Sequence, residues 1–484
     1  MVMVPKKTWL SGVKKRLDVP HDQQASLGIL AFETARTMSR LVSLHRSLSE
    51  SEILNLRHDV MRSPGVAYLN STNQLFLLRL AAADMVDELD HAADAIVRLS
   101  DRAGRNSRLR EFQILKSGFG RGVDYSGTGL RLGGFSANEM DKKVKTMEKY
   151  IFSTSNLHEA MEKLAEMEAS ERKLQQWTNN SGPMAPSTGS GSPPGADVFL
   201  KKLAAQKKTV RKIQRDALWG QSFESITDLM AKAALTIFAK ICYVFSMYVP
   251  NLPTCSVADR QGKYRIINKN NDTIHPNYSS GPLDRPPVNG PILIRNSGPL
   301  FYPRAEFSKW AAKTLEPEPN TVGDSGLAIR YADVIIAARK MVMAPEMVGE
   351  DSRMTLYRML PNGIRKAVRA KMRGNRMTMT DRGSSSDCRN DEDTLMAEGW
   401  REAAMRILEW LAPMANDTST WQLEKSCERK RLYDPTAVVN KKVFALQTLL
   451  FSDKEKTEAA IVEVLVGLCC VCRYNGMGRI DDSD

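Results

Sequence analysis

Histidine and cysteine, the side chains that most often bind transition metals, are scarce in this sequence. Its 484 residues include six histidines and seven cysteines, and the histidines are widely scattered. His158-Glu159 begins like the helix of a zinc protease, but Glu162 stands where the second histidine ligand would be needed. Cys469 and Cys472 lie three residues apart and have no second ligand pair at a suitable spacing. We therefore predict neither a metal site nor a cofactor.

Long apolar runs are absent as well. Residues 1–20 are basic but contain no apolar stretch long enough for a secretory signal peptide. The most apolar window, 459–472, is interrupted by Glu463 and is too short to span a bilayer. The odd number of cysteines, three of them at 469, 470 and 472, does not indicate a disulfide framework. We expect an intracellular protein, with these cysteines as small core residues and palmitoylation or redox sensing as the alternative.

No nucleotide-binding or catalytic motif is complete. The glycine-rich segment 127–134, GTGLRLGG, has Leu132 where a dinucleotide fingerprint needs glycine, and no βαβ pattern surrounds it. A Gly-Lys-Ser/Thr sequence is also missing, so we interpret this segment as a plain loop. Acidic residues are grouped at 84–90 and 391–393, but charge runs usually form solvated helix faces or loops. We predict no catalytic residue and no enzymatic activity.

What the chain does have is an excess of positive charge. Its 69 Lys and Arg against 56 Asp and Glu give a net charge of +13, which favours anionic partners. Two basic segments stand out, 201–215 and 365–373. In the second, basic residues at helical spacing predict a face for docking an anion or a partner, with a plain solvated face as the alternative. The residues concerned are Arg365, Lys366, Arg369, Lys371 and Arg373.

Specific nucleic-acid recognition is not indicated by these basic segments. They contain no zinc-finger, basic-zipper or homeodomain pattern. Aromatic residues are not interleaved with the basic ones, so the stacking of bases is unsupported. The charge alone leaves other proteins, an anionic membrane surface or nucleic acid as partners, and no small-molecule ligand is implied.

Apolar residues recur at helical spacing through most of the sequence, which predicts an all-α fold of helical bundles joined by long flexible or irregular linkers. Two capping boxes, Ser49 with Glu52 and Ser71 with Gln74, mark helix starts in the N-terminal part. Residues 137–177 show heptad-like spacing. Because Thr154 and His158 occupy its seam, an intramolecular helical hairpin is favoured over an autonomous coiled-coil dimer.

Residues 321–373 predict three consecutive helices. Gly323, Asp324 and Ser325 are expected to cap the first, and Pro345 to end it. Asp351 or Ser352 is expected to cap the second. Pro361 fits the first position of the third helix, on which Ile364, Ala367 and Val368 are expected to face the core.

The organisation predicted from these patterns is a series of helical units separated by polar segments. Residues 178–197 and 379–393 have the composition of flexible linkers, the second serine-rich and open to phosphorylation. The predicted units are a basic tail at 1–25, a helical domain at 26–116, a Gly-rich loop at 117–136, a heptad-like arm at 137–177, a Gly/Ser/Pro linker at 178–197, basic then apolar helices at 198–248, an irregular connection at 249–320, a helical domain at 321–475 and a polar tail at 476–484.

Two blocks of the sequence resemble a known plant family. LAIRYADVIIAARKMV followed by LYRMLPNGIRKAVRAKMR is similar to the C-terminal domain of the phytosulfokine simulator family. LGILAFETARTMSRLVSLHRSLSESEILNLRHDVMRSPGV resembles that family's N-terminal domain, and LQTLLFSDKEKTEAAIVEVLVGLCCVCRY its C-terminal ending. Both domains are of unknown function. The resemblance implies a plant regulatory protein that promotes growth and is linked to phytosulfokine peptide-hormone signalling, acting as a non-enzymatic adaptor.

The sequence leaves other functions and locations open. A peripheral membrane or nucleic-acid-associated protein that uses the basic helices is the second hypothesis, and a cryptic enzyme is the third. Some family members begin Met-Gly and look N-myristoylated, whereas this chain begins Met1-Val2-Met3, so we expect no such lipid. The basic residues near Trp9 fit nuclear import, membrane contact or a solvated disordered tail. Nucleus, cytoplasm and plasma-membrane surface therefore all fit.

Overall fold

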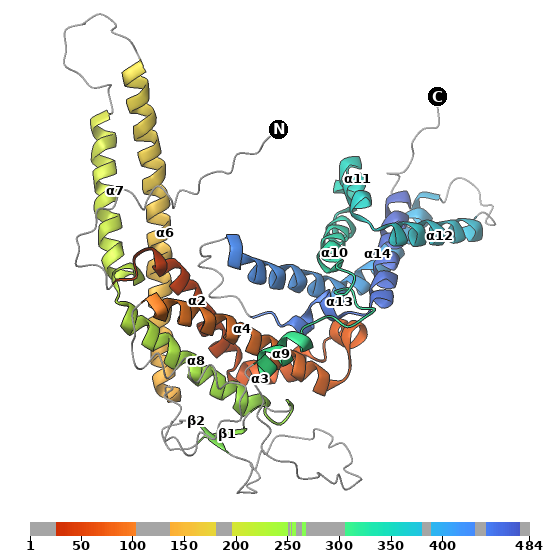
Figure 1. The fold of residues 1–484 in the computed structure, drawn as a ribbon. Helices are drawn as coiled ribbons and strands as arrows, with labels where there is room; N and C mark the ends of the chain where they lie inside the picture. Colours follow the sequence, from red (N-terminus) through yellow and green to blue (C-terminus); the bar gives the residue numbers. More distant parts are fainter. Residues whose placement is uncertain are drawn as a thin grey trace, which may run out of the picture.

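The computed structural model describes residues 26–102, 136–180, 196–249, 252, 254–257, 264–267, 305–379, 389–430 and 442–474. Within these residues the chain is helical except for a short antiparallel hairpin of two strands, which confirms the all-α fold class. Figure 1 shows α2, α4, α6 and α8 on one side of the molecule and α10 to α14 on the other. The Gly-rich segment and both chain ends (1–25 and 475–484) lie outside the described residues.

The N-terminal helices pack an apolar stripe into the core, as their sequence predicts. In order they are η2 (Gly28–Leu30), α2 (Ala31–Ser47), α3 (Glu50–Asn55), the π-helical turns η3 (Leu56–Val60) and η4 (Val66–Asn70), and α4 (Gln74–Arg102). Ser49 caps α3 as predicted, since its hydroxyl accepts a hydrogen bond from the Glu52 N–H at 3.4 Å. The predicted cap of α4 is wrong. Asn73 Oδ1, rather than the Ser71 hydroxyl, accepts the N–H groups of Leu75 and Phe76, at 3.0 and 3.2 Å.

Helix α4 is the centre of the N-terminal half. It contacts α2, α8 and α9, and from Leu80 to Val86 every residue is buried. A helix that is enclosed on all sides belongs to a core rather than to a surface. One of the enclosed residues is Asp84, with 2% of its surface exposed, so this helix carries an ionisable carboxyl group into the interior.

The middle of the chain forms a helical pair and a strand hairpin. Its elements are α6 (Ala137–Asn180), α7 (Ala196–Asp216), η5 (Leu218–Gly220), α8 (Phe223–Phe245), β1 (Thr254–Val257), β2 (Tyr264–Ile267) and α9 (Ala305–Thr314). Helix α7 packs against α6 in the same chain. Helix α9 and the two strands fall within 249–320, so the prediction of an irregular connection there is wrong for these residues. Both strands are only four residues long, which hides their period in the sequence.

The C-terminal helices form the second half of the molecule. They are α10 (Ala328–Met343), η6 (Pro345–Met347), α11 (Glu350–Met359), α12 (Asn362–Met379), α13 (Arg389–Lys430), η8 (Ala445–Gln447), η9 (Leu449–Phe451) and α14 (Lys454–Tyr474). Helix α10 ends just before Pro345, as predicted. Its core anchor is the fully buried Tyr331, whose hydroxyl donates to Glu458 of α14 at 2.6 Å. Helix α13 begins inside the predicted 379–393 linker.

The predicted caps of α10 and α11 are wrong. Residues 321–326 form a tight turn ahead of α10, in which Gly326 has a φ of +67° and the Ser325 hydroxyl donates back to Val322 O at 2.7 Å. Gly323 is forced by packing, because a Cβ there would lie 2.8 Å from Pro317 Cγ. Helix α11 is preceded by Gly349 and has no side-chain cap. The Ser325 hydroxyl is used within the turn, which spacing along a sequence does not reveal.

Two hydrophobic clusters are joined by contacts between segments that are far apart in the sequence. The first includes α2, α4 and α8 together with residues 444–446, and the second includes α10, α13 and α14 together with Leu69. At the junction, Asn70 Nδ2 donates to Leu446 O at 2.6 Å and Asn70 Oδ1 accepts from the Ser452 hydroxyl at 2.6 Å. The Asp453 N–H donates to Leu69 O at 2.8 Å. The end of the described chain thus closes on the N-terminal helices.

Candidate functional site

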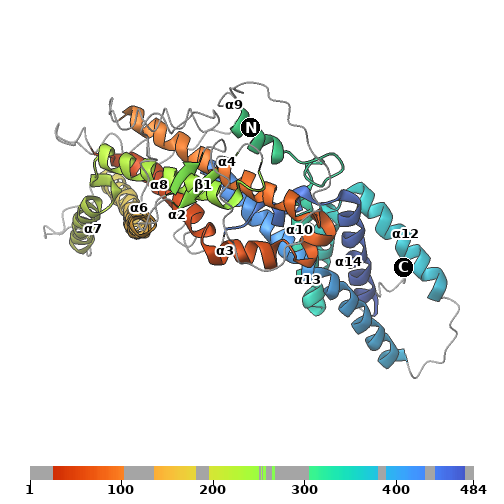
Figure 2. The same cartoon turned by 90° about the horizontal axis from the view of Figure 1, so that it is seen from below.

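The predicted docking residues lie on α12, at the edge of the C-terminal bundle beside α14 (Figure 2). The Pro361 carbonyl accepts the Arg365 N–H at 3.0 Å, so α12 begins immediately after this proline. Ile364 is buried, and Val368 packs in part against the C-terminal cluster. Ala367, which we predicted to face the core, is exposed. Four of the basic side chains project from the other side of the helix, and Lys371 lies on the side of Ile364.

Arg365 serves the end of α11. Its guanidinium donates to the Arg358 carbonyl at 3.1 Å, while Arg330 of α10 donates to the Met359 carbonyl at 2.5 Å. The last carbonyls of a helix have no partner within it, so these two arginines supply what the α11 C-terminus lacks. The Nε of Arg365 is buried and has no hydrogen-bond partner among the described residues. Arg365 therefore stabilises the C-terminal end of α11 and is less available to a partner than an unpaired arginine.

Tyr357 organises the next basic residue along α12. The guanidinium carbons of Arg365 and Arg369 lie 4.8 and 5.7 Å from the centre of the Tyr357 ring, within the range of cation–π attraction. Arg369 also donates to the Tyr357 hydroxyl. One ring on α11 therefore fixes two cations on α12, which reduces the side-chain entropy that a partner would have to remove on binding.

The remaining three predicted residues differ in how free they are. Lys371 forms an ion pair with Glu463 of α14, in which both side chains are about half exposed (47% and 46%). Lys366 and Arg373 are exposed and have no ion pair or hydrogen bond within the described part of the chain. Arg365, Lys366, Arg369 and Arg373 thus share one helix face, on which Lys366 and Arg373 are the available charges, whereas Lys371 lies on the side of the helix that faces α14.

The other sequence candidates do not assemble into a site. Among the described residues, no three or more His, Cys, Asp or Glu side chains gather as metal ligands would. His158 packs edge-on against Phe32, with ring centres 5.6 Å apart. Cys470 and Cys472 are buried, as predicted for core residues, but Cys469 is exposed.

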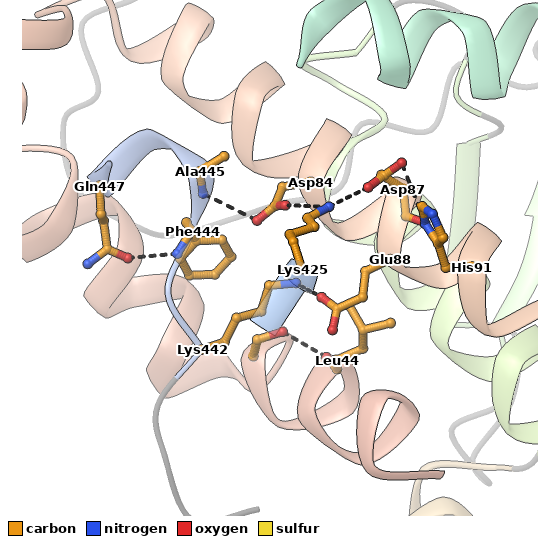
Figure 3. A network of polar contacts seen from close by, with 11 residues as sticks. Leu44, Asp84, Asp87, Glu88, His91, Lys425, Lys442, Phe444, Ala445 and Gln447 are labelled. Carbon is orange, nitrogen blue, oxygen red and sulfur yellow. Dashed lines mark hydrogen bonds and ion pairs between the residues drawn. The ribbon is translucent and has the colours of Figure 1, made fainter. Parts of the chain in front are cut away.

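A charged cluster that the sequence did not reveal lies between α4 and the last part of the chain (Figure 3). Lys442 forms an ion pair with Glu88. Lys425 forms an ion pair with Asp87 and lies 3.8 Å from Asp84 Oδ1. Asp84 Oδ2 also accepts the Ala445 N–H at 3.3 Å. Contrary to our interpretation of 84–90 as a solvated helix face, part of this run is an interior contact between distant segments.

Burial and the neighbouring charges set the protonation of this cluster. Burial raises the pKa of Asp84, although Lys442 and Lys425 oppose the shift. Burial alone would lower the pKa of Lys442, but Glu88 and Asp84 outweigh it, so the pKa of Lys442 is raised and the amine stays charged. Glu424 reaches the surface, yet partial burial and the carboxylates of Glu88 and Asp84 raise its pKa to about 7.

One signal in the sequence could have exposed the cluster. Leu77, Ala81, Asp84 and Glu88 follow each other at spacings of four and three, so two acids continue an apolar stripe. An acid at such a position predicts a buried partner. The partner itself, Lys442, could not be located, because it lies 354 residues further along the chain.

Two family models match parts of the chain that contain the residues described above. A family model described as a domain of unknown function (DUF3475) matches residues 29–85, which include α2, α3 and the first part of α4. A second family, a protein of unknown function (DUF668), matches residues 321–420, which include α10 to α12 and most of α13. The predicted docking residues on α12 therefore lie within the second match, and Asp84 within the first. Helices α6 and α7 lie in neither.

Three curated proteins of Arabidopsis thaliana match almost the whole chain. Protein PSK SIMULATOR 3 is 23% identical over 91% of the chain, PSK SIMULATOR 1 is 23% identical over 91%, and PSK SIMULATOR 2 is 22% identical over 96%. The PSK SIMULATOR proteins are homologues of this chain. It spans 56%, 55% and 62% of their respective lengths. The resemblance predicted from the sequence blocks is thereby confirmed.

No solved structure matches the chain. None of the helices in the described residues combines the length and the apolar character that crossing a bilayer requires.

Proposed function

We propose that the chain is a non-enzymatic regulatory adaptor of plants, linked to phytosulfokine signalling and growth promotion, which docks an acidic protein partner on α12. The link to phytosulfokine rests on the names of the homologous PSK SIMULATOR proteins. The docking site rests on one observation. Helix α12 carries basic residues and no acidic residue between Asn362 and Met379.

The geometry supports a protein partner at this face. Arg365 and Arg369 are held on the Tyr357 ring, and Lys366 and Arg373 stand unpaired beside them. Charge complementarity of this kind steers association and selects partners more than it adds affinity. A fixed pattern of cations suits an acidic protein surface, because both sides then present charges at defined positions.

Proximity labelling in plant cells tests this proposal. The double variant K366E/R373E reverses only the two unpaired charges, so α11 and α12 keep their contacts. A control with the same change in charge is K142E/K145E, on the exposed side of α6. We expect a reproducible acidic partner that the wild type and the control label and K366E/R373E does not.

The partner should also dissociate from the purified protein as salt concentration rises, because exposed charges are screened. Equal labelling by all three forms, or an association that is insensitive to salt, would refute docking at α12.

A further inference from the structure

Helix α7 carries a second basic face that neither matched family covers. Between Val198 and Arg215 the helix contains no acidic residue. Its basic residues are Lys201, Lys202, Lys207, Lys208, Arg211, Lys212 and Arg215. From Lys201 to Arg215 the helix rises about 21 Å at 1.5 Å per residue. Lys201, Lys208, Lys212 and Arg215 form a straight row along one side of this helix.

The inner side of α7 is fixed against α6. Leu203 and Val210 are buried in this contact, with 3% and 5% of their surface exposed. Gln206 Nε2 donates to the Ala160 carbonyl at 2.9 Å, and Lys207 pairs with Glu168 at 3.5 Å. The helix is therefore supported along its length, and its apolar side is already covered.

The outer side of α7 has no such partners. Lys201, Lys208 and Lys212 lie on one helical face because their spacings of seven and four bring them into line. They are exposed, as are Arg211 and Arg215. None of these five side chains forms an ion pair or a hydrogen bond with another described residue. Their charge is therefore available to a molecule outside the chain.

Two apolar side chains are exposed at the start of the same helix. Val198 is 57% exposed and Leu200 46%, immediately before Lys201 and Lys202. Figure 1 shows this end of α7, with the adjoining end of α6, extending away from the other helices. Residues two apart point about 200° apart around a helix, so Val198 and Leu200 flank the row of lysines on either side, and a bilayer that receives this end of α7 can reach the row and both apolar side chains.

We propose that the outer face of α7 binds the surface of a lipid bilayer that contains anionic headgroups such as phosphatidylserine. Four to eight cations on an amphipathic helix form the pattern that recognises such surfaces, and each contributes through attraction to the negative leaflet. A flat surface meets the whole straight row at once. Val198 and Leu200 reach the boundary between headgroups and acyl chains, where apolar side chains are stabilised.

A nucleic acid explains less of this face. Phosphate contacts would use the same cations but would leave Val198 and Leu200 in water. No aromatic residue stands on the outer side of α7 between Val198 and Arg215 to stack on bases. The occupant that uses both the charge and the apolar pair is a membrane.

The test measures binding of the full-length protein to vesicles of phosphatidylcholine with and without phosphatidylserine. The variant K201Q/K208Q/K212Q removes three aligned charges. Its matched control, K142Q/K145Q/K149Q, removes three exposed lysines from α6. Each cation near the surface is worth about fivefold in affinity, so the α7 variant should bind the anionic vesicles about a hundredfold more weakly. The control should change binding by less than tenfold, and K201R/K208R/K212R should retain it.

A second pair of measurements separates a membrane from a nucleic acid. V198S/L200S should weaken binding to phosphatidylserine vesicles and leave binding to duplex DNA unchanged. The proposal is overturned if the α7 variant and its control weaken vesicle binding equally, if phosphatidylserine makes no difference, or if duplex DNA is bound more tightly than the vesicles. Because α12 is unaltered in every variant, these results do not depend on the adaptor proposal.

Discussion

Replacing Lys442 by methionine tests the charged cluster between α4 and the last part of the chain. The Lys442 side chain is 5% exposed and pairs with Glu88, which keeps 24% of its side-chain surface exposed. Removing one partner of a buried ion pair costs about 3–5 kcal/mol. The partial exposure of Glu88 places K442M near the lower end, at about 3 kcal/mol of lost unfolding free energy near neutral pH.

Urea denaturation followed by circular dichroism measures this loss, provided that the slopes of the two unfolding curves agree. K371M is the matched control, because Lys371 also forms an ion pair, yet its side chain is 47% exposed. A pair that is open to solvent is worth about 0–1 kcal/mol. Lowering the pH should reduce the cost of K442M, since the carboxyl groups left without a counter-charge then bind protons. Equal losses for K442M and K371M, or a loss that grows as the pH falls, would refute the reasoning.

Three further predictions concern single residues. The pKa of Glu424 is raised from 4.5 to about 7, so its stabilising contribution is complete below pH 4.5 and is lost as the pH rises through 7. E424Q should therefore flatten the dependence of the unfolding midpoint on pH in that window; an unchanged profile would contradict the shift. G323A should lose about 2 kcal/mol in urea denaturation through overpacking, and G349A, which has open space around it, almost nothing. N73A should lose about 1 kcal/mol in thermal unfolding, and S71A clearly less; the reverse order would restore Ser71 as the cap of α4.

The sequence predicts those features of the structure that depend on interactions between residues close together in the chain. Helical stripes, the Ser49 cap and the stop at Pro345 depend on residues within one or two turns, and all three agree with the structure. The cap of α10 does not. One of its predicted capping residues, Gly323, is held in the turn at 321–326 by a hydrogen bond from its N–H to Leu450 O, and this distant contact cannot be recognised from the neighbouring sequence. Two four-residue strands and a ten-residue helix within 249–320 are too short to show a period.

The same division applies to the candidate sites. The row of cations on α12 follows from spacing alone, although Lys371 lies on the side of the helix that faces α14, away from the other four. That Arg365 and Arg369 are held by Tyr357, while Lys366 and Arg373 are free, depends on how α11 turns into α12. The cluster around Asp84 depends on partners more than 330 residues away, so only the acid on an apolar stripe could be recognised beforehand.

The closure of residues 442–453 onto Asn70 and Asp84 has a consequence for variation within this group of proteins. Because the N-terminal block (26–102) and the C-terminal block (321–474) contact each other directly, the stretch of chain between them is not what holds them together. Lengthening such a connection costs little free energy once its ends are fixed. Insertions and deletions should therefore accumulate between the blocks, and cutting the chain before residue 442 should loosen the N-terminal block even though every residue of that block remains.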